Sequence, residues 1–589
     1  MKKTSKIEQF IIWRKKNISD RQFILALSII VGLLAGFAAV IIKNLVHYIQ
    51  ELLSRIASKE FDLLYIIYPI IGLTVVLLFI KYINKRPVRH GIPNVLYSIS
   101  KTGGILHTHN LYSSIISSAL TVGFGGSVGL EGPTVATGAA IGSNLAKFLK
   151  LDHKQVLLLL GCACAGAMSA IFKAPIAAIV FVLEVIMFDL TMSAIVPLLI
   201  SSATAALTSY FFLGKNYLYI FNVQQEFQLD QLIYFVIIGV VTGLVSVYFT
   251  KMYMLVTGFF DRIKNSFNKL FIGGISLGLL IFLVPALYAE GYSVINRSLM
   301  GDITYLYENT FYSGLGDYIP SIFILLVLII ALKVVATSIT FGSGGVGGIF
   351  APTLFTGANT GLLFAKVMNS FGLILPESNF ALVGMAGLLA GVLHAPLTAI
   401  FLIAEITGGY ELFMPLMIVA AISYTTVRIF VSNSVYTIQL AQRGELITHH
   451  KDKAVLMMLN IKDLIETDFN VVHPNQKLGD LIKEISHTHR NLFPVVESDN
   501  TFRGIVKMDD IRHIMFNPDL YENVFVRDLM FMPDYVIDPN DSMEEIAKKF
   551  QVSERYNIAV IENGKYLGFI SRARLFSLYR KQVSESSEH

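Results

Sequence analysis

Apolar positions dominate long stretches of the first part of the chain. Five runs contain no charged residue: 23–42, 63–80, 232–249, 270–288 and 322–332. Most are long enough, at 1.5 Å per residue, to cross about 30 Å of hydrocarbon as a helix. From about residue 446 charged positions become dense and no such run remains. The pattern predicts a polytopic membrane part over 23–445, followed by a soluble tail.

Composition agrees with this division. Hydrophobic residues make up 54% of the 589 positions and charged residues only 15%, with a mean hydropathy of +0.61. The net charge of +5 is spread along the chain and gives no case for a nucleic-acid partner. Basic residues precede the first run, which favours a cytoplasmic N-terminal segment over 1–22: Lys2, Lys3, Lys6, Arg14, Lys15 and Lys16. We expect an integral protein of the cell (inner) membrane.

The membrane part contains an internal repeat. "GPTVATGA" (132–139) matches "APTLFTGA" (351–358), and the stretch 165–185 matches 386–406 at nearly the same offset. Because two separate segments recur at nearly the same distance along the chain, we predict that a whole unit is duplicated, over about 23–215 and 230–445. Duplicated membrane folds often bind their ion where the halves meet. The residues alone do not say whether the repeats are parallel or inverted.

Three Gly- and Pro-containing stretches interrupt the apolar pattern: 89–95, 123–133 and 342–352. Proline suits the first turn of a helix, and a helix start offers free N–H groups and a positive dipole end that suit an anion. Close helix packing through small residues is the alternative for any single stretch. "GSGGVG" also fits a dinucleotide motif, but apolar spans flank it and no βαβ unit surrounds it. Three such stretches, two of them related by the repeat, favour an anion site.

Glu131 is the one carboxylate in "GGSVGLEGPTVATGAAIGS" (125–143). At a helix start it competes with an anion for the same N–H donors. Deprotonated, it occupies the site, and protonated, it leaves, so Glu131 is a candidate gate and proton carrier. The alternative is an ordinary N-terminal helix acid stabilised by the dipole. Glu405 repeats Glu184 in the second half, and we expect it to cap buried backbone at a helix end.

The motifs that carry a family resemblance lie in order along 23–445: "RHGIPNV" (89–95), "GLEGP" (129–133), "APIAAIVFVLEV" (174–185), "GGIFAP" (347–352) and "SVYTIQL" (434–440). With them the membrane part resembles the CLC family of chloride channels and proton-coupled chloride antiporters. The resemblance implies an all-α inverted repeat with discontinuous helices, in a homodimer with one pore per subunit in the lipid bilayer.

By position, the resemblance implies that Glu131 is the gating glutamate. It also implies a set of anion-binding positions: His90, Gly91, Ile92, Gly129, Leu130, Gly132, Gly348, Ile349, Phe350 and Tyr436. Chloride or a similar small anion is then the substrate ion, and no cofactor is required. Taken alone, Tyr436 is equally consistent with an ordinary interfacial aromatic.

Several positions depart from the family pattern, among them Asn94, which replaces a glutamate expected to be peripheral to the pore. Val185 stands where many antiporters have an internal proton-relay glutamate, and valine carries no proton. Leu130 replaces the usual basic residue beside the gate and should weaken the local positive field. His90 replaces the usual serine. It either makes conduction pH-dependent between about pH 5 and 8 or lies neutral and turned away from the pore.

The tail contains two similar modules. "VVHPNQKLGDLIKEI" (471–485) matches "VIDPNDSMEEIAKKF" (536–550). The modules, 464–517 and 526–580, resemble tandem cytoplasmic CBS domains of α/β fold, which bind ATP or another adenine nucleotide in some proteins. The candidate nucleotide contacts are Asp510, Ser571, Arg572 and Arg574, although Lys507 and Arg574 depart from the usual pattern. A purely dimerising role is equally consistent.

Together these observations predict gated transmembrane conduction of chloride and similar small anions. A proton-coupled chloride antiporter of the same fold is the alternative. An intramembrane enzyme is disfavoured, because no H-E-x-x-H or G-x-S-x-G motif occurs in the spans and the histidines form no metal-binding set. Cys162 and Cys164, in "GCACAG", are expected to be small packing residues rather than metal ligands.

Overall fold

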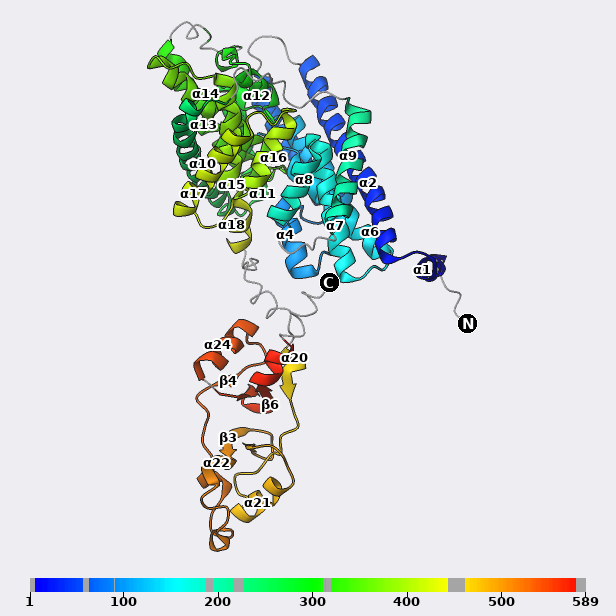
Figure 1. Cartoon of the computed structure of the whole chain (residues 1–589), viewed down its shortest axis with the longest axis vertical. Coiled ribbons are helices and arrows are strands. Elements are labelled where there is room, and N and C mark those ends of the chain that lie inside the picture. Colours follow the sequence, from blue (N-terminus) through cyan, green and yellow to red (C-terminus); the bar gives the residue numbers. More distant parts are fainter. Residues whose placement is uncertain are drawn as a thin grey trace. The chain divides into compact units, whose positions relative to one another are not determined.

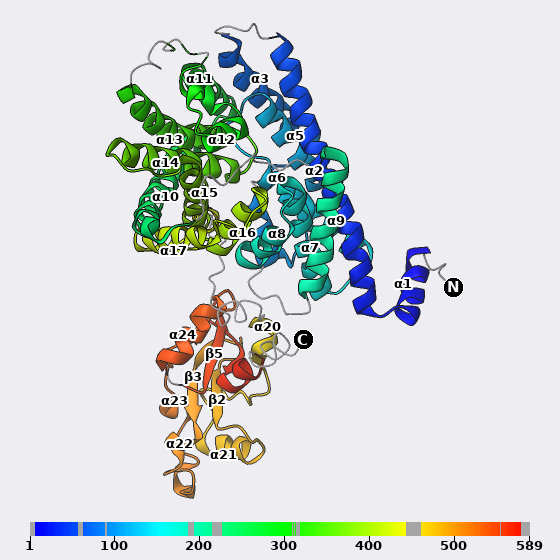
Figure 2. The ribbon, with the colours of Figure 1, turned by 45° about the horizontal axis from the view of Figure 1, so that its top comes forward.

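The computed structural model describes residues 6–56, 63–88, 91–186, 194–214, 227–308, 310, 313, 319–442, 461–553 and 555–578. The chain divides into two compact units, Met1–Leu446 and Ile447–His589. The first unit is a bundle of helices, and the second combines short helices with strands (Figures 1 and 2).

The first half of the membrane unit contains α1 (Lys6–Asn17), α2 (Asp20–Ile56), α3 (Leu64–Leu78), η1 (Phe79–Asn84), α4 (Gly91–Thr102), α5 (Asn110–Gly123), α6 (Glu131–Phe148), α7 (His153–Phe172), α8 (Pro175–Phe181), η2 (Val182–Ile186) and α9 (Ile195–Leu213). The second half contains η4 (Leu229–Gln231), α10 (Leu232–Asp261), α11 (Ser266–Leu283), η5 (Pro285–Leu287), α12 (Tyr292–Leu299), η6 (Thr304–Leu306), α13 (Ile319–Gly342), α14 (Phe350–Ser370), α15 (Glu377–Leu393), α16 (Pro396–Ile406), α17 (Phe413–Phe430) and α18 (Val435–Gln442).

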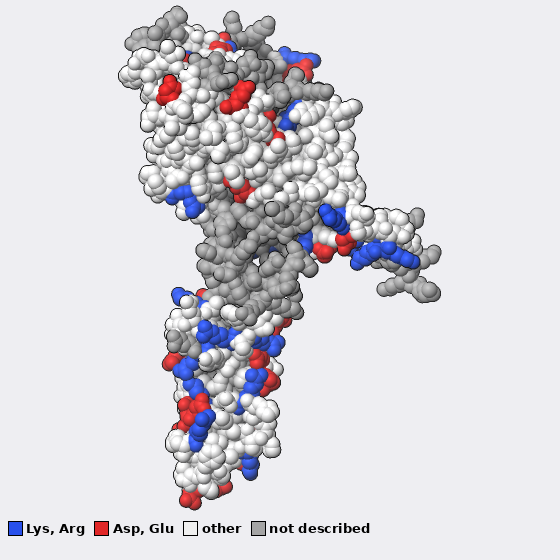
Figure 3. All heavy atoms as spheres, viewed as in Figure 1, with Lys and Arg blue, Asp and Glu red and all other residues white. Residues whose placement is uncertain are grey.

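The prediction of several membrane-spanning helices is confirmed. Among the described residues, eight helices are long and apolar enough to cross a membrane. On the face shown in Figure 3, Lys, Arg, Asp and Glu are sparse over the membrane unit, whereas both signs of charge are frequent on the tail. A surface with so few charges suits contact with lipid rather than water.

The internal repeat is visible in how helices pack. Gly142 of α6 lies against α7, where an added Cβ would be 2.5 Å from the Leu159 carbonyl oxygen. Gly361 takes the same position in α14, where a Cβ would overlap the Phe380 carbonyl of α15. These glycines bring two helix pairs into backbone contact, as small residues do in membrane proteins.

Each half also contains a helix that stops and restarts. α7 ends at Lys173 and α15 at His394, both in the left-handed conformation (φ 58° and 56°), and a proline starts the next helix in each case. The break leaves N–H groups of α8 and α16 without intrahelical partners.

Glutamates from the opposite half satisfy these free N–H groups. The Glu405 carboxylate accepts hydrogen bonds from the N–H groups of Ile176 and Ala177, at 3.0 and 2.7 Å. The Glu184 carboxylate accepts from the N–H groups of Leu397 and Thr398, at 3.1 and 2.7 Å, and from the Thr398 hydroxyl. The capping role expected for Glu405 is confirmed. Because each half caps the other in the same way, the halves are related by an approximate two-fold.

The tail contains α20 (Ile461–Leu464), β1 (Ile465–Glu466), α21 (Leu478–Ser486), β2 (Leu492–Val496), β3 (Phe502–Lys507), α22 (Met508–Ile511), η8 (Pro518–Leu520), α23 (Val526–Leu529), β4 (Val536–Ile537), α24 (Met543–Ser553), β5 (Asn557–Glu562) and β6 (Lys565–Ser571). One sheet has the order β1-β6-β5-β4, and the other pairs β2 with β3.

The two modules of the tail exchange strand segments. β1, at the start of the first module, pairs antiparallel with β6 of the second. Phe531, near the start of the second module, bridges Ile505 in β3 of the first. Asn500 and Tyr566 also bond each other reciprocally, through a backbone N–H at 3.1 Å and the Asn500 side-chain amide at 2.9 Å. Each module therefore completes the sheet of its neighbour.

Candidate anion site at converging helix starts

The three glycine-containing stretches meet through their backbones. Gly129 and Gly348 form an antiparallel bridge, with N–H to O=C distances of 2.8 and 2.7 Å in the two directions. A Cβ at Gly91 would lie 2.5 Å from the Gly132 carbonyl carbon. Residues with side chains would separate these segments. The N-terminal ends of α4, α6 and α14 therefore converge on one place.

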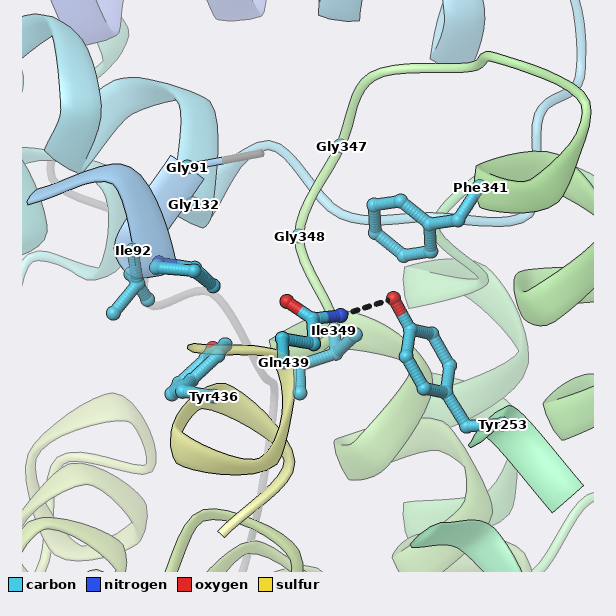
Figure 4. A pocket seen from close by; sticks show the side chains of 11 residues that line it. Gly91, Ile92, Gly132, Tyr253, Phe341, Gly347, Gly348, Ile349, Tyr436 and Gln439 are labelled. Atoms are coloured by element: carbon cyan, nitrogen blue, oxygen red, sulfur yellow. Dashed lines mark hydrogen bonds between the residues drawn. The ribbon is translucent and has the colours of Figure 1, made fainter. Parts of the chain in front are cut away.

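A pocket lies at this convergence, lined by Gly91, Ile92, Pro93, Gly132, Tyr253, Phe341, Gly347, Gly348, Ile349, Tyr436 and Gln439. Figure 4 shows Tyr436 and Gln439 of α18, with Tyr253 of α10, around the loop that carries Gly347 and Gly348. Helix starts on several sides direct positive dipole ends toward this space, which favours a negative occupant.

The pocket has one polar side chain without a partner. The Tyr436 hydroxyl is buried and makes no hydrogen bond with any residue that the structure describes. Gln439, one turn further along α18, donates from Nε2 to the Tyr253 hydroxyl at 2.7 Å. An unpaired buried hydroxyl costs free energy unless a ligand or water satisfies it. Tyr436 is therefore placed to donate to an occupant of the pocket.

Six of the expected anion-binding residues line the pocket: Gly91, Ile92, Gly132, Gly348, Ile349 and Tyr436. Gly129, Leu130 and Phe350 lie within three positions of lining residues in sequence but do not line it. The Gly348 N–H donates to the Gly129 carbonyl, so it is not a free donor. His90 lies outside the described residues.

Five lining residues were not expected from the sequence: Pro93, Tyr253, Phe341, Gly347 and Gln439. Gln439 lies three positions after Tyr436, which is the spacing of neighbours on one helix face. That spacing would have identified it. Tyr253 lies within a long apolar helix and carries no comparable signal.

Glu131 begins α6 and is fully buried. The Tyr292 hydroxyl of α12 donates to Oε1 at 2.5 Å. Oε2 makes no hydrogen bond with any described residue. This oxygen lies over Gly129, where a Cβ would overlap it. The carboxylate is therefore next to the Gly129–Gly348 bridge, with one oxygen held and the other unpaired.

Val185 lies in η2 and is buried in the apolar core. Its neighbour Glu184 is already engaged in capping α16. The position after Glu184 is therefore occupied by an aliphatic side chain among other apolar residues.

In the tail, Ser571 and Arg574 of the second module bind residues at the start of the first. The Ser571 hydroxyl donates to Glu466 at 2.5 Å, and the Arg574 guanidinium donates to the Asp463 carbonyl at 3.2 and 3.1 Å. Asp510 and Arg572 are exposed. Among the described residues no hydrogen bond or ion pair joins Asp510 to this group.

Fold and site together define a class: a duplicated helical membrane protein with a pocket among discontinuous helix starts and a paired α/β tail. The family model described as voltage gated chloride channel matches residues 71–428, and the CBS domain model matches 461–517 and 526–581. The chain belongs to the CLC family and has a C-terminal CBS pair, so the resemblance and the expected fold class are confirmed.

Curated relatives agree. A protein of Ralstonia nicotianae named putative chloride channel protein ClcB-like is 30% identical over 385 residues, 62% of this chain and 83% of the relative. A voltage-gated ClC-type chloride channel ClcB of Citrobacter koseri is 29% identical over 363 residues, 60% of this chain and 81% of the relative.

Solved structures support the fold. A slow cyanobacterial Cl⁻/H⁺ antiporter is 22% identical, with a TM-score of 0.62 over 72% of this chain and 99% of its own. A eukaryotic CLC transporter is 17% identical, with a TM-score of 0.62 over 94% of this chain and 97% of its own. The chain is therefore an integral membrane protein related to chloride transport proteins.

Proposed function

We propose that this chain conducts chloride and similar small anions across the membrane and that Glu131 gates the conduction. The pocket among the starts of α4, α6 and α14 carries the proposal, because it combines positive helix ends with the unpartnered Tyr436 hydroxyl. The N–H group of Ile349, immediately before α14, would bind the anion together with that hydroxyl.

Gating follows from the position of Glu131. As a carboxylate it carries negative charge beside the bridge of Gly129 and Gly348, and so repels an anion approaching that point. Protonation removes the charge and lets the side chain leave its place over Gly129. Anion flux should then rise as the pH falls.

Val185 supports passive conduction rather than proton coupling. A buried valine offers no group to carry a proton toward the other side of the membrane. The alternative, a proton-coupled chloride antiporter, would need another proton path past this position. The resemblance to CLC proteins further suggests a homodimer in the cell (inner) membrane, with the N-terminus and the tail in the cytoplasm.

A flux assay in chloride-loaded liposomes tests this proposal. External chloride and pH are recorded together, with voltage clamped by a potassium ionophore. We expect rapid chloride loss that increases at low pH, without uphill proton movement. Proton uptake against its gradient, driven by chloride, would instead establish the antiporter.

Variants of the gate and the pocket are compared in the same assay. Glu131→Gln should reach the low-pH rate of the wild type already at neutral pH and lose its pH dependence. Tyr436→Phe should reduce flux at every pH. If Glu131→Gln retains the pH response of the wild type, Glu131 is not the gate. His90→Ser then tests the separate expectation that His90 contributes to pH dependence.

For the tail, the contacts of Ser571 and Arg574 favour a role in joining the modules over nucleotide binding. An adenine nucleotide at these residues would have to displace Arg574 from the Asp463 carbonyl. We therefore expect no change in the thermal midpoint of the purified protein when ATP is added. A concentration-dependent rise in the midpoint would show that the tail binds nucleotide.

A further inference from the structure

A second carboxylate, Glu290, lies near Glu131 and has no role in the proposed mechanism. Glu290 belongs to the segment between η5 and α12, which packs on the loop before Glu131. The Ser127 hydroxyl donates to the Leu287 carbonyl at 2.8 Å, and two residues after Glu290 the Tyr292 hydroxyl donates to Glu131. The segment is therefore fixed against the start of α6.

Two lysines from other helices face Glu290. Lys333 of α13 is fully buried and donates to the carbonyls of Ala289 and Leu287, at 2.9 and 3.4 Å. Lys43 of α2 donates to the Ile171 carbonyl at 2.5 Å. Both ammonium groups attract the Glu290 carboxylate.

The remaining groups that face Glu290 come from α6. The Leu130 backbone N–H, immediately before this helix, favours the charged form of the Glu290 carboxylate, and Glu131 repels it. Lys173, at the end of α7, repels Lys43 and so acts on the cluster indirectly. Burial opposes a charge on Glu290 most strongly and charged Glu131 adds to this opposition, whereas Lys43, Lys333 and one backbone N–H favour the charge.

Exposure differs between the two carboxylates. Glu131 has no exposed surface, whereas Glu290 is partly exposed and does not line the anion pocket. Glu131 interacts electrostatically with Tyr436 of the pocket and also with Glu290. Glu131 therefore interacts both with a group of the anion pocket and with Glu290, and Glu290 retains some exposed surface, which Glu131 lacks.

We propose that Glu290 is a second proton-binding group, which transfers protons between water and Glu131. Neutral Glu290 gives its proton to the Glu131 carboxylate and becomes charged. Lys43 and Lys333 stabilise that charge, and Glu290 then takes a new proton from water. The repulsion between the two carboxylates keeps them from being charged together, which favours one shared proton. This inference rests on the proposed gating by Glu131.

The experiment measures how fast anion flux responds to a pH step applied to one side of the membrane. Full-length protein is reconstituted with one orientation selected, and the variants are Glu290→Gln and Glu290→Asp. The pH step is applied to each side in turn. We expect Glu290→Gln to slow the response at least tenfold for steps on one side, the side from which Glu290 takes its proton. Steady flux at low pH should stay within about twofold of the wild type. Glu290→Asp should retain most of the response rate.

Matched controls separate this role from a structural one. Glu411→Gln removes an exposed glutamate elsewhere and should change nothing. A response rate equal to that of the wild type in Glu290→Gln would overturn the proposal. So would an equal loss of flux at every pH, or a Glu290→Asp response as slow as that of Glu290→Gln.

Two further outcomes are interpretable. If Glu290→Gln does not assemble, as judged by gel filtration in detergent, Glu290→His takes its place, because histidine binds a proton near pH 6.5. It should keep a fast response with a shifted pH midpoint, and an unshifted midpoint would overturn the proposal. If Glu131→Gln keeps its pH dependence, the gating proposal itself has failed, and that result is distinct from a failure at Glu290.

Discussion

At the scale of single residues, two features allow the Glu131 carboxylate to stay in its place. One is a hydrogen bond to the carboxylate, and the other is a neighbouring glycine without a side chain. Tyr292 donates to Oε1, and Gly129 leaves room for Oε2. A charge-assisted hydrogen bond of this kind contributes about 1.5 kcal/mol or more. The retention of the carboxylate in its place therefore depends measurably on Tyr292.

Tyr292→Phe removes that hydrogen bond while keeping the ring. A loss of about 1.4 kcal/mol corresponds to a tenfold change in an equilibrium, so the carboxylate should leave its place about tenfold more often. We expect a several-fold higher chloride flux at neutral pH in the liposome assay. Tyr288→Phe is the matched control, because its hydroxyl donates to the Gly123 carbonyl and not to Glu131. Equal flux in both variants would contradict the role given to Tyr292.

The sequence predicts part of this site because some residues contrast with their surroundings. Glu131 is a lone carboxylate in a glycine-containing stretch, and its placement at a helix start was predicted and is confirmed. Glu290 and Lys333 are charged residues that also adjoin or interrupt apolar runs, and the same contrast with their surroundings would have identified them. Tyr292 and Tyr253 were not predicted, because an aromatic residue near an apolar segment has many ordinary packing roles.

At the scale of helices, the two breaks in the halves depend on glutamates from the opposite half. Proline and a left-handed residue end one helix and start the next, which the sequence indicates. The sequence predicts that Glu405 caps backbone groups at a helix end. It does not predict that each glutamate caps a helix of the opposite half. That pairing depends on the approximate two-fold.

Glu405→Ala should destabilise the membrane unit by about 1–2 kcal/mol, the usual cost of losing an N-terminal cap. The N–H groups of Ile176 and Ala177 would lose their acceptor, and no backbone carbonyl replaces it at a helix start. Thermal unfolding of the detergent-purified protein, followed by circular dichroism or aggregation, measures the effect. Glu411→Ala, which removes an exposed glutamate, is the control. Equal midpoints for the two variants would argue against capping.

Backbone contact between α14 and α15 leads to a second prediction for helices. A Cβ at Gly361 would overlap the Phe380 carbonyl, so Gly361→Ala should force these helices apart and cost about 1–3 kcal/mol. Gly258 lies in α10 with open space where its Cβ would be, and Gly258→Ala should be neutral or stabilising by up to about 1 kcal/mol. The two midpoints are compared in the same unfolding assay. A neutral Gly361→Ala would show that these helices separate easily.

At the scale of the whole molecule, both units are built from two related halves that complete each other. In the membrane unit the halves share the Gly129–Gly348 bridge and exchange caps, and in the tail the modules exchange strand segments. Repeated sequence predicts that such halves exist. It does not predict the exchanged contacts, because these depend on how the halves are oriented.

The shared core of the tail makes its two modules depend on one another. Phe569 of the second module is buried, and its ring centroid lies 4.6 Å from that of Phe469 in the first module. Removing a buried phenylalanine typically costs about 3–5 kcal/mol. Because this core contains residues from both modules, Phe569→Ala should weaken the whole tail rather than the second module alone.

Limited proteolysis of the full-length protein tests this dependence. In Phe569→Ala, cleavage within the first module should accelerate together with cleavage within the second. Phe516→Ala is the control, since Phe516 is 79% exposed and its loss should leave the cleavage rates unchanged. If only the second module becomes sensitive, the modules fold independently despite their exchanged strands. If both modules become more sensitive to proteolysis together, a ligand or partner that stabilises one module would also stabilise the other.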